Sequence, residues 1–185
     1  LYKNSAFIRG LTERIITLTI GCGIQFLPSS TSDRYNLASS ARLKRWGRRP
    51  AVRCPFTWRQ IQRIIFRAVL TDGEIFVYHT MKDGEPRIML IESHMIGKGY
   101  SRAWSGEPDG IVLDSDGDPV AYEYYPDQSN GRPNGKPIVL PAESVTHFML
   151  PDRADLYRGV TPYHSVITTA HDVHDILAME KAAVK

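Results

Sequence analysis

The chain has 185 residues, of which 42% are hydrophobic and 23% are charged, as in an ordinary globular domain. This composition excludes disordered, collagen-like and coiled-coil chains, and no apolar run reaches the roughly 20 residues that a membrane-spanning helix needs. Two cysteines, Cys22 and Cys54, are too few for a disulfide framework and fit a reducing compartment. The chain begins at Leu1 rather than at a methionine and ends inside an expected helix, so we interpret it as one domain fragment of a larger subunit.

The net charge of +3 hides a strong asymmetry along the chain. Residues 1–70 contain 13 lysines and arginines against two acids, a net charge of +11. Residues 71–185 contain ten basic residues against 18 acids, a net charge of −8. Arginine dominates the basic half and suits paired contacts with phosphate or carboxylate groups. These arginines are therefore expected either to pair with the acidic half, of this or a neighbouring subunit, or to contact nucleic acid.

The N-terminal part of the chain predicts two helices and one strand. Apolar residues at helical spacing predict a helix over residues 5–20, ended by two glycines. Ile24–Phe26 then predicts a strand, and Leu37–Trp46 predicts a short basic helix that Gly47 and Pro50 end.

The clearest predicted helix spans Thr57–Leu70, with Thr57 as its N-cap. Arginines recur every four residues along a face different from the apolar one, which is typical of a solvated face and, less often, of a specific contact. A denser basic cluster precedes this helix. The possible DNA or inter-subunit contacts in the two groups are Arg42, Lys44, Arg45, Arg48, Arg49, Arg53, Arg59, Arg63 and Arg67.

Beyond residue 71 the pattern changes from helices to antiparallel strands joined by turns. The expected strands are Glu74–Thr80, Arg87–Glu92, Gly110–Leu113, Val120–Tyr125, Ile138–Leu140 and Val145–Leu150. In the first strand, Ile75 and Val77 are expected on one side of the sheet, with Phe76 and Tyr78 on the other. A loop at Pro151–Gly159 leads to a helix that begins near Pro162 and runs towards Lys185.

This order of elements predicts an α+β fold, with N-terminal helices, a central meander of antiparallel hairpins and a C-terminal helix. We divide the chain into a mainly helical basic segment at 1–70, an antiparallel β region at 71–150, and a loop with the start of a long helix at 151–185. Together these segments are expected to form one domain fragment of a larger subunit.

Two constellations suggest metal binding. The acidic run Asp114–Asp118 resembles a calcium loop, but an EF-hand needs glycine at its sixth position and glutamate at its twelfth, whereas here glycine is fourth and Tyr125 stands twelfth. We therefore predict a hairpin turn. His164, His171 and His174 could share one face of a helix, but the chain offers few further ligands for them.

Catalysis has little support from the sequence. No phosphate-binding glycine loop and no serine nucleophile elbow occurs, and neither cysteine has a neighbouring histidine. We predict that the protein is not an enzyme and that it holds no cofactor or metal. The alternatives that remain open are a sequence-independent nucleic-acid-binding module and, with less support, a metal-dependent hydrolase built on the three histidines.

Several short segments together resemble a known family. Asp72-Gly73-Glu74 stands between an amphipathic helix and a hairpin, and His147-Phe148 is followed after a short interval by Arg158-Gly159 and Pro162. Between them lie Gly110–Tyr122 and Pro141–Thr146. In this order and spacing the segments are similar to those of the phage portal proteins of the lambda family, over roughly residues 4–185. No single segment is specific, and Asp72-Gly73-Glu74 and Arg158-Gly159 are expected to be fold-determining turns.

The resemblance implies the wing-like outer part of a portal subunit from a phage or prophage. Such subunits form a ring, in many cases a dodecamer, at one capsid vertex. Double-stranded DNA passes through this ring, driven by a separate terminase, and the tail connector later attaches to it. The implied location is the virion, with assembly in the host cytoplasm and no role for a membrane. On this interpretation the arginines face either DNA or the acidic half of an adjacent subunit.

Overall fold

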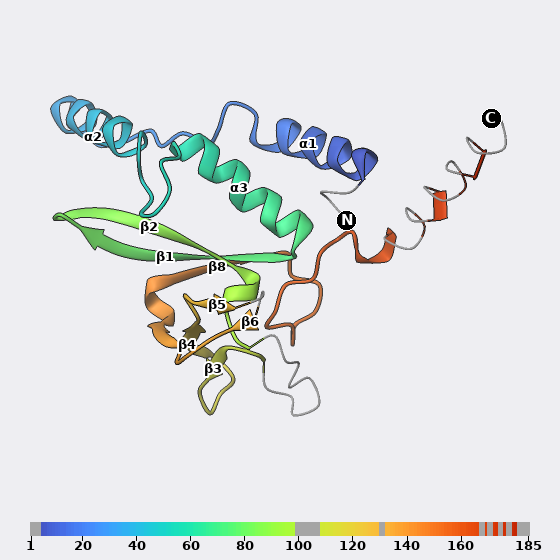
Figure 1. The fold of residues 1–185 in the computed structure, drawn as a ribbon. Helices are drawn as coiled ribbons and strands as arrows, with labels where there is room; N and C mark the ends of the chain where they lie inside the picture. Colours follow the sequence, from blue (N-terminus) through green and yellow to red (C-terminus); the bar gives the residue numbers. More distant parts are fainter. Residues whose placement is uncertain are drawn as a thin grey trace.

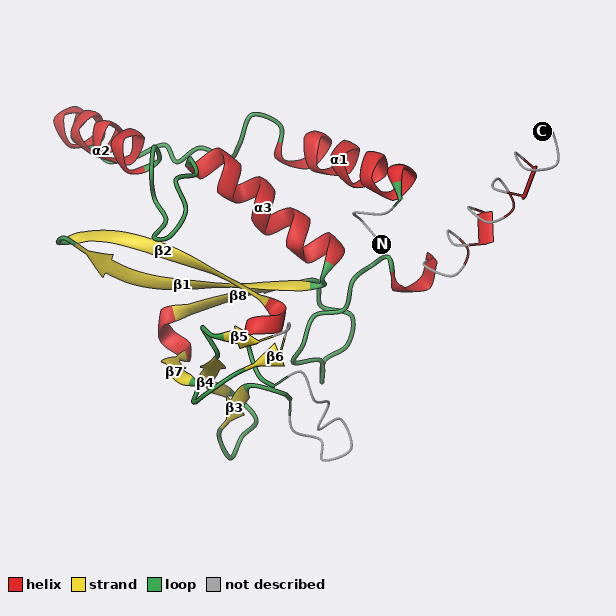
Figure 2. Ribbon diagram, in the orientation of Figure 1, coloured by secondary structure: helices red, strands yellow, loops and turns green. Residues whose placement is uncertain are grey.

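In the computed structural model, the described part of the chain contains three α-helices, two antiparallel sheets of three strands and a short pair of strands (Figures 1 and 2). The structure describes residues 5–98, 108–129 and 132–166, and single positions at 169, 172, 173, 176, 179 and 180. The helices lie on one side of the first sheet, and the second sheet lies on its other side (Figure 1). No helix in the described ranges is both long and apolar enough to cross a membrane. The architecture agrees with the predicted α+β class.

Each helix begins at a side chain that satisfies a free backbone N–H group. The helices are α1 at Ala6–Ile20, α2 at Asp33–Trp46 and α3 at Trp58–Thr71. Ser5 and Ser32 cap α1 and α2, and Thr57 caps α3 as predicted. In α3 the cap is reciprocal, because the side chain of Gln60 accepts a hydrogen bond from the backbone of Thr57.

In the N-terminal part, the predicted start of one helix and one predicted strand are wrong. The helix expected at Leu37–Trp46 starts four residues earlier, because Ser32 caps it and Asp33 lies in its first turn, where a negative charge is favourable. The expected strand at Ile24–Phe26 does not form. The side-chain amide of Gln62 instead makes both hydrogen bonds to the backbone of Ile24, at 2.7 and 2.9 Å, in place of a neighbouring strand.

The first sheet has the strand order β2-β1-β8 and the second has the order β3-β4-β7. The first comprises β1 at Glu74–Lys82, β2 at Glu85–Glu92 and β8 at Val145–Met149. The second comprises β3 at Ile111–Leu113, β4 at Pro119–Tyr124 and β7 at Ile138–Pro141. Short elements complete the fold: β5 at Gln128–Ser129, β6 at Arg132–Pro133, and the 3-10 helices η1 at Ser93–Met95, η2 at Ala142–Ser144 and η3 at His164–Val166.

The first half of β1, Glu74–Val77, is buried on both faces and lies at the centre of the fold. Val77 packs towards the helices with Ile61 of α3 and Ile88 of β2. Phe76 points the other way, into the core between the two sheets, where it contacts Tyr122. The predicted alternation along this strand is confirmed for these two residues.

Helix α1 is joined to α3 and to the segment after residue 160. Ile8 and Ile16 of α1 pack with Leu70 and Tyr163 in a third apolar cluster. The hydroxyl groups of Thr12 and Tyr163 lie 2.9 Å apart in this cluster, so the buried polar atoms are paired.

The predicted C-terminal helix is not confirmed. After Pro162 the structure gives the bounds of one element, the 3-10 helix η3. Most of the remaining positions towards Lys185 lie outside the described residues. A long helix in this region therefore stays a prediction.

We expect Ile16→Ala to lower the free energy of unfolding by about 2–5 kcal/mol, because the substitution leaves a cavity between α1 and α3. Leu18→Ala in the same helix is the matched control and should change it by less than about 0.5 kcal/mol. Ile16 is fully buried, whereas the side chain of Leu18 is 73% exposed. Urea unfolding followed by circular dichroism measures both. Equal losses for the two variants would mean that α1 does not pack as described.

Candidate functional site

Glu74 carries a buried carboxylate at the start of β1. It follows the turn Asp72-Gly73, which ends α3, and only 1% of its surface is exposed. A buried charge is tolerated only where hydrogen bonds and an opposite charge compensate for lost hydration. The surroundings of Glu74 therefore decide whether the domain can close around it.

Four groups from three other segments bind this carboxylate. One oxygen accepts hydrogen bonds from Ser93 Oγ at 2.6 Å and from Arg158 Nε at 2.7 Å. The other accepts from the backbone N–H of Gly159 at 2.6 Å and lies 2.9 Å from Nε2 of His147. An ionised carboxylate can only accept, so this ring nitrogen carries the hydrogen atom. Both oxygens are thus fully satisfied.

Arg158 extends the cluster to two further segments. Its guanidinium group donates to the carbonyl oxygens of Ser93, Ile96 and Asp109, at 3.1, 3.3 and 2.5 Å. One planar side chain therefore holds the end of the β1–β2 hairpin, the segment after η1 and the segment before β3. We call Glu74, Ser93, His147 and Arg158 the Glu74 cluster.

The backbone approaches closely beside the cluster, and glycine permits this. Gly73 has φ +92°, and a Cβ atom there would lie 2.6 Å from the carbonyl oxygen of Gly159. A Cβ atom on Gly159 would likewise collide with the backbone of Gly73. The two glycines of the motifs noted in the sequence thus bring Glu74 and Arg158 together.

The environment of Glu74 shifts its pKa. Burial alone would raise the pKa, but hydrogen bonds from His147, Arg158 and Ser93 and the positive charge of Arg158 outweigh burial. The net effect lowers the pKa of Glu74 from 4.5 to about 2. The carboxylate is therefore ionised at neutral pH, where it holds the surrounding segments together.

Sequence reasoning did not identify this cluster. Asp72-Gly73-Glu74, His147 and Arg158-Gly159 were recognised in the sequence only as segments of a family pattern or as turns, and not as one site. The usable signal was the presence of a glutamate, a histidine and an arginine, one in each of three separate segments. These three residues come into contact only because of the order in which the strands pair, and this order could not be predicted from the sequence.

The arginine stripe on α3 faces α1 and not only solvent. Arg63 and Arg67 form ion pairs with Glu13 of α1, at 3.2 and 2.7 Å. Arg59 donates to the carbonyl oxygen of Gly21 at 3.3 Å. Both partners lie within residues 1–70, the basic half of the chain. Three of the residues predicted to contact DNA or another subunit, Arg59, Arg63 and Arg67, therefore make their contacts inside the domain.

The remaining basic residues differ in their surroundings. Arg53 donates to the hydroxyl group of Tyr124 at 2.8 Å. The others are exposed, as Arg53 is, and within the described ranges no acid forms an ion pair with them. These exposed residues are Arg42, Lys44, Arg45, Arg48 and Arg49.

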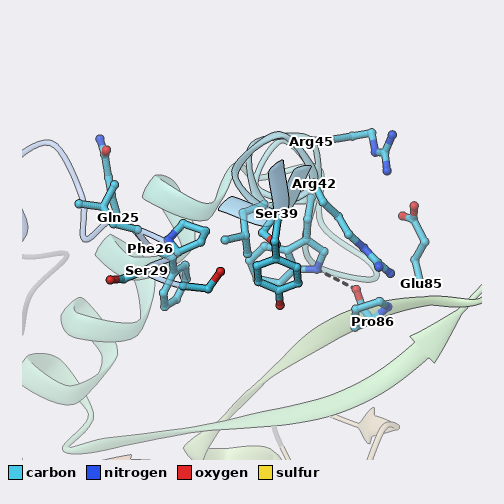
Figure 3. A pocket seen from close by; sticks show the side chains of 14 residues that line it. Gln25, Phe26, Ser29, Ser39, Arg42, Arg45, Glu85 and Pro86 are labelled. Carbon is cyan, nitrogen blue, oxygen red and sulfur yellow. Dashed lines mark hydrogen bonds between the residues drawn. The ribbon is translucent and has the colours of Figure 1, made fainter. Parts of the chain in front are cut away.

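A hollow of about 910 Å³ lies beside these residues, between α2, the loop at 25–30 and the start of β2 (Figure 3). We call it the α2 groove. Arg42 and Arg45 extend from α2 on the side of Glu85 and Pro86 (Figure 3). Trp46 anchors the end of the helix, because its Nε1 donates to the carbonyl oxygen of Pro86 at 2.8 Å.

The residues considered for metal binding do not form a site in the described ranges. No three histidine, cysteine, aspartate or glutamate side chains there come together as metal ligands. His164 is exposed in η3, whereas His171 and His174 lie outside the described residues. The acidic run at Asp114–Asp118 forms the predicted hairpin turn, in which Asp114 accepts from two backbone N–H groups of its own loop.

We expect Glu74→Gln to lower the free energy of unfolding at pH 7 by about 3 kcal/mol, the value of a pKa shift of this size. Because the folded pKa is lowered from 4.5 to about 2, the stabilisation is complete above pH 4.5 and is lost as the pH falls towards 2. Glu74→Gln should remove this pH dependence.

Urea unfolding between pH 2 and pH 7 measures the effect of Glu74→Gln. Glu92→Gln is the matched control, because the side chain of Glu92 is 68% exposed and should contribute little. If the wild-type protein and the Glu74→Gln variant lost stability in parallel below pH 4.5, the role assigned to the carboxylate would be wrong.

Comparison with known proteins agrees with the resemblance seen in the sequence. The model of the family described as phage portal protein, lambda family, matches residues 1–185, the whole chain. No curated protein matches the chain. The family predicted from the order of the short segments is confirmed. The chain therefore belongs to the lambda family of phage portal proteins.

Proposed function

We propose that this chain is a structural subunit of a portal ring at the capsid vertex of a phage or prophage. The ring forms the conduit through which double-stranded DNA is packaged and ejected, and it is the docking point for terminase and the tail connector. Family membership over residues 1–185 supports a general portal role, with an oligomeric assembly at the capsid vertex. In this role the protein works in the virion after assembly in the host cytoplasm, and it acts by binding rather than by catalysis.

The division of charge is the observation that carries this proposal. Residues 1–70 have a net charge of +11 and residues 71–185 a net charge of −8. A ring needs contacts between two unlike faces of neighbouring subunits, and opposite charges make such faces complementary. Because Arg63 and Arg67 pair with Glu13, they are not free for this contact. The exposed basic residues that could make it include Arg42, Lys44, Arg45, Arg48 and Arg49.

We expect the protein expressed from its complete reading frame to form closed rings of about a dozen copies. Negative-stain electron microscopy gives the shape, and light scattering gives the mass of the assembly. Raising the salt concentration should slow assembly, because screening weakens contacts between opposite charges. A species that stays monomeric at every protein concentration would contradict the proposal.

The exposed arginines after α2 support a second candidate, a module that binds nucleic acid without sequence preference. Arg48 and Arg49 are exposed and form no ion pair with any acid that the structure describes. If they contact phosphate groups, Arg48→Ala with Arg49→Ala should reduce the salt dependence of DNA binding by a slope of about 2.

A filter-binding titration across salt concentrations measures this slope. Arg9→Ala with Arg14→Ala is the matched control, because it removes the same charge from exposed positions of α1. A slope that the first pair of substitutions leaves unchanged would exclude DNA contact at Arg48 and Arg49.

A further inference from the structure

Helix α2 and the loop before it present an apolar surface that the described residues leave uncovered. No residue of α2 is buried. Phe26 and Leu27 of the loop are 54% and 84% exposed, and Tyr35 of the helix is 61% exposed. These side chains line the α2 groove (Figure 3). Contiguous exposed apolar surface of this kind typically marks a binding site for another protein.

The charges beside the groove define what could occupy it. Arg42 and Arg45 line it and form no ion pair with a described acid. Glu85 also lines the groove, but its carboxylate is bound by Arg87 at 3.0 Å. An occupant should therefore combine carboxylates with apolar side chains.

The tip of the β3–β4 hairpin has this composition. Asp114, Asp116 and Asp118 are all exposed, and no described lysine or arginine forms an ion pair with them. Val112 and Val120 on the flanking strands are 41% and 46% exposed. The acidic tip thus offers both the charge and the apolar surface that the groove lacks.

The acidic tip is also rigid before any contact forms. Oδ1 of Asp114 accepts hydrogen bonds from the backbone N–H groups of Asp116 and Asp118, both at 2.9 Å. The hydroxyl group of Tyr157 donates to the carbonyl oxygen of Gly117 at 3.0 Å. A preformed tip loses little conformational entropy on binding, which favours its use as a contact.

The groove and the acidic tip lie on opposite sides of the molecule. In Figure 1, α2 lies on one side of the β2-β1-β8 sheet, and the turn between β3 and β4 projects on the other. A chain in this conformation cannot place its own tip in its own groove. Two copies can do so, and the contact is then head-to-tail, as a ring requires.

We propose that the β3–β4 tip of one copy docks in the α2 groove of the next copy. Asp116 and Asp118 then face Arg42 and Arg45, and Val112 and Val120 cover apolar groove residues. This inference rests on the ring proposed above and names its contact surfaces. The apolar walls of the groove favour a protein over a phosphate backbone, whose contacts are made mainly by polar and charged groups.

Cysteine cross-linking tests the contact in the protein expressed from its complete reading frame. Ser39→Cys places a thiol in the groove and Ser115→Cys places one at the tip, with Cys22→Ser and Cys54→Ala removing the native thiols. A short bis-maleimide should give a ladder of covalent oligomers. The control pair, Thr19→Cys with Ser115→Cys, uses an exposed position on α1 and should give none.

Two single-cysteine proteins make the test directional. A mixture of Ser39→Cys and Ser115→Cys subunits should yield covalent dimers but no trimers or higher oligomers. Each copy then carries a thiol on only one of the two surfaces that meet in a head-to-tail contact. Cross-linking of either single variant with itself would indicate a symmetric contact and would overturn the proposal.

Charge reversal tests the pairing of charges. Arg42→Glu with Arg45→Glu, and Asp116→Lys with Asp118→Lys, should each lower the cross-linking yield about tenfold or more, and the combination of all four should restore it. Circular dichroism checks that these exposed substitutions leave the fold intact. Failure of the combination to restore the yield would overturn the pairing.

The outcomes separate the contact from the ring. Rings seen by electron microscopy without cross-linking between positions 39 and 115 would overturn the contact and leave the portal ring standing. Absence of rings in the wild-type protein would overturn both. Rings that persist in the Arg42→Glu, Arg45→Glu variant but lose DNA binding would assign the groove to nucleic acid and overturn the contact.

Discussion

The described part of the fold depends on the buried charge of Glu74. The carboxylate of Glu74 is 1% exposed, and a charge in that position is stable only if each of its oxygens is bound. Arg158, His147, Ser93 and the backbone of Gly159 meet this requirement. The loop after β8 must therefore return to the start of β1. This constraint joins the two sheets, the end of α3 and the loop after β8 in one arrangement.

Two groups of arginines in the basic half have different roles. Arg63 and Arg67 of α3 face α1 and hold it against the body of the domain through Glu13. Those on and after α2 face outwards, beside an apolar groove that no described segment fills. The fold thus uses some arginines of the basic half for contacts within the domain and leaves others exposed for contacts with a partner.

The parts of the fold that the sequence predicts are those set by neighbouring residues. The cap at Thr57 depends on residues three positions apart, and the sides of β1 follow from the alternation of a strand. The expected strand at Ile24–Phe26 failed because Gln62, 38 positions away, binds its backbone instead. The Glu74 cluster joins residues 73 and 84 positions apart, so the spacing of residues along the chain carries no direct signal of it.

The contact between Gly73 and Gly159 has an evolutionary consequence. At each position glycine is required because a Cβ atom would collide with the backbone of the other glycine. A backbone, unlike a side chain, cannot be replaced by mutation. If either glycine mutated to alanine, no second mutation could make room for the new methyl group by shortening a neighbouring side chain. Related sequences should retain both glycines independently, without the correlated exchange that marks side-chain pairs, so covariation methods would be blind to one of the tightest contacts in the domain.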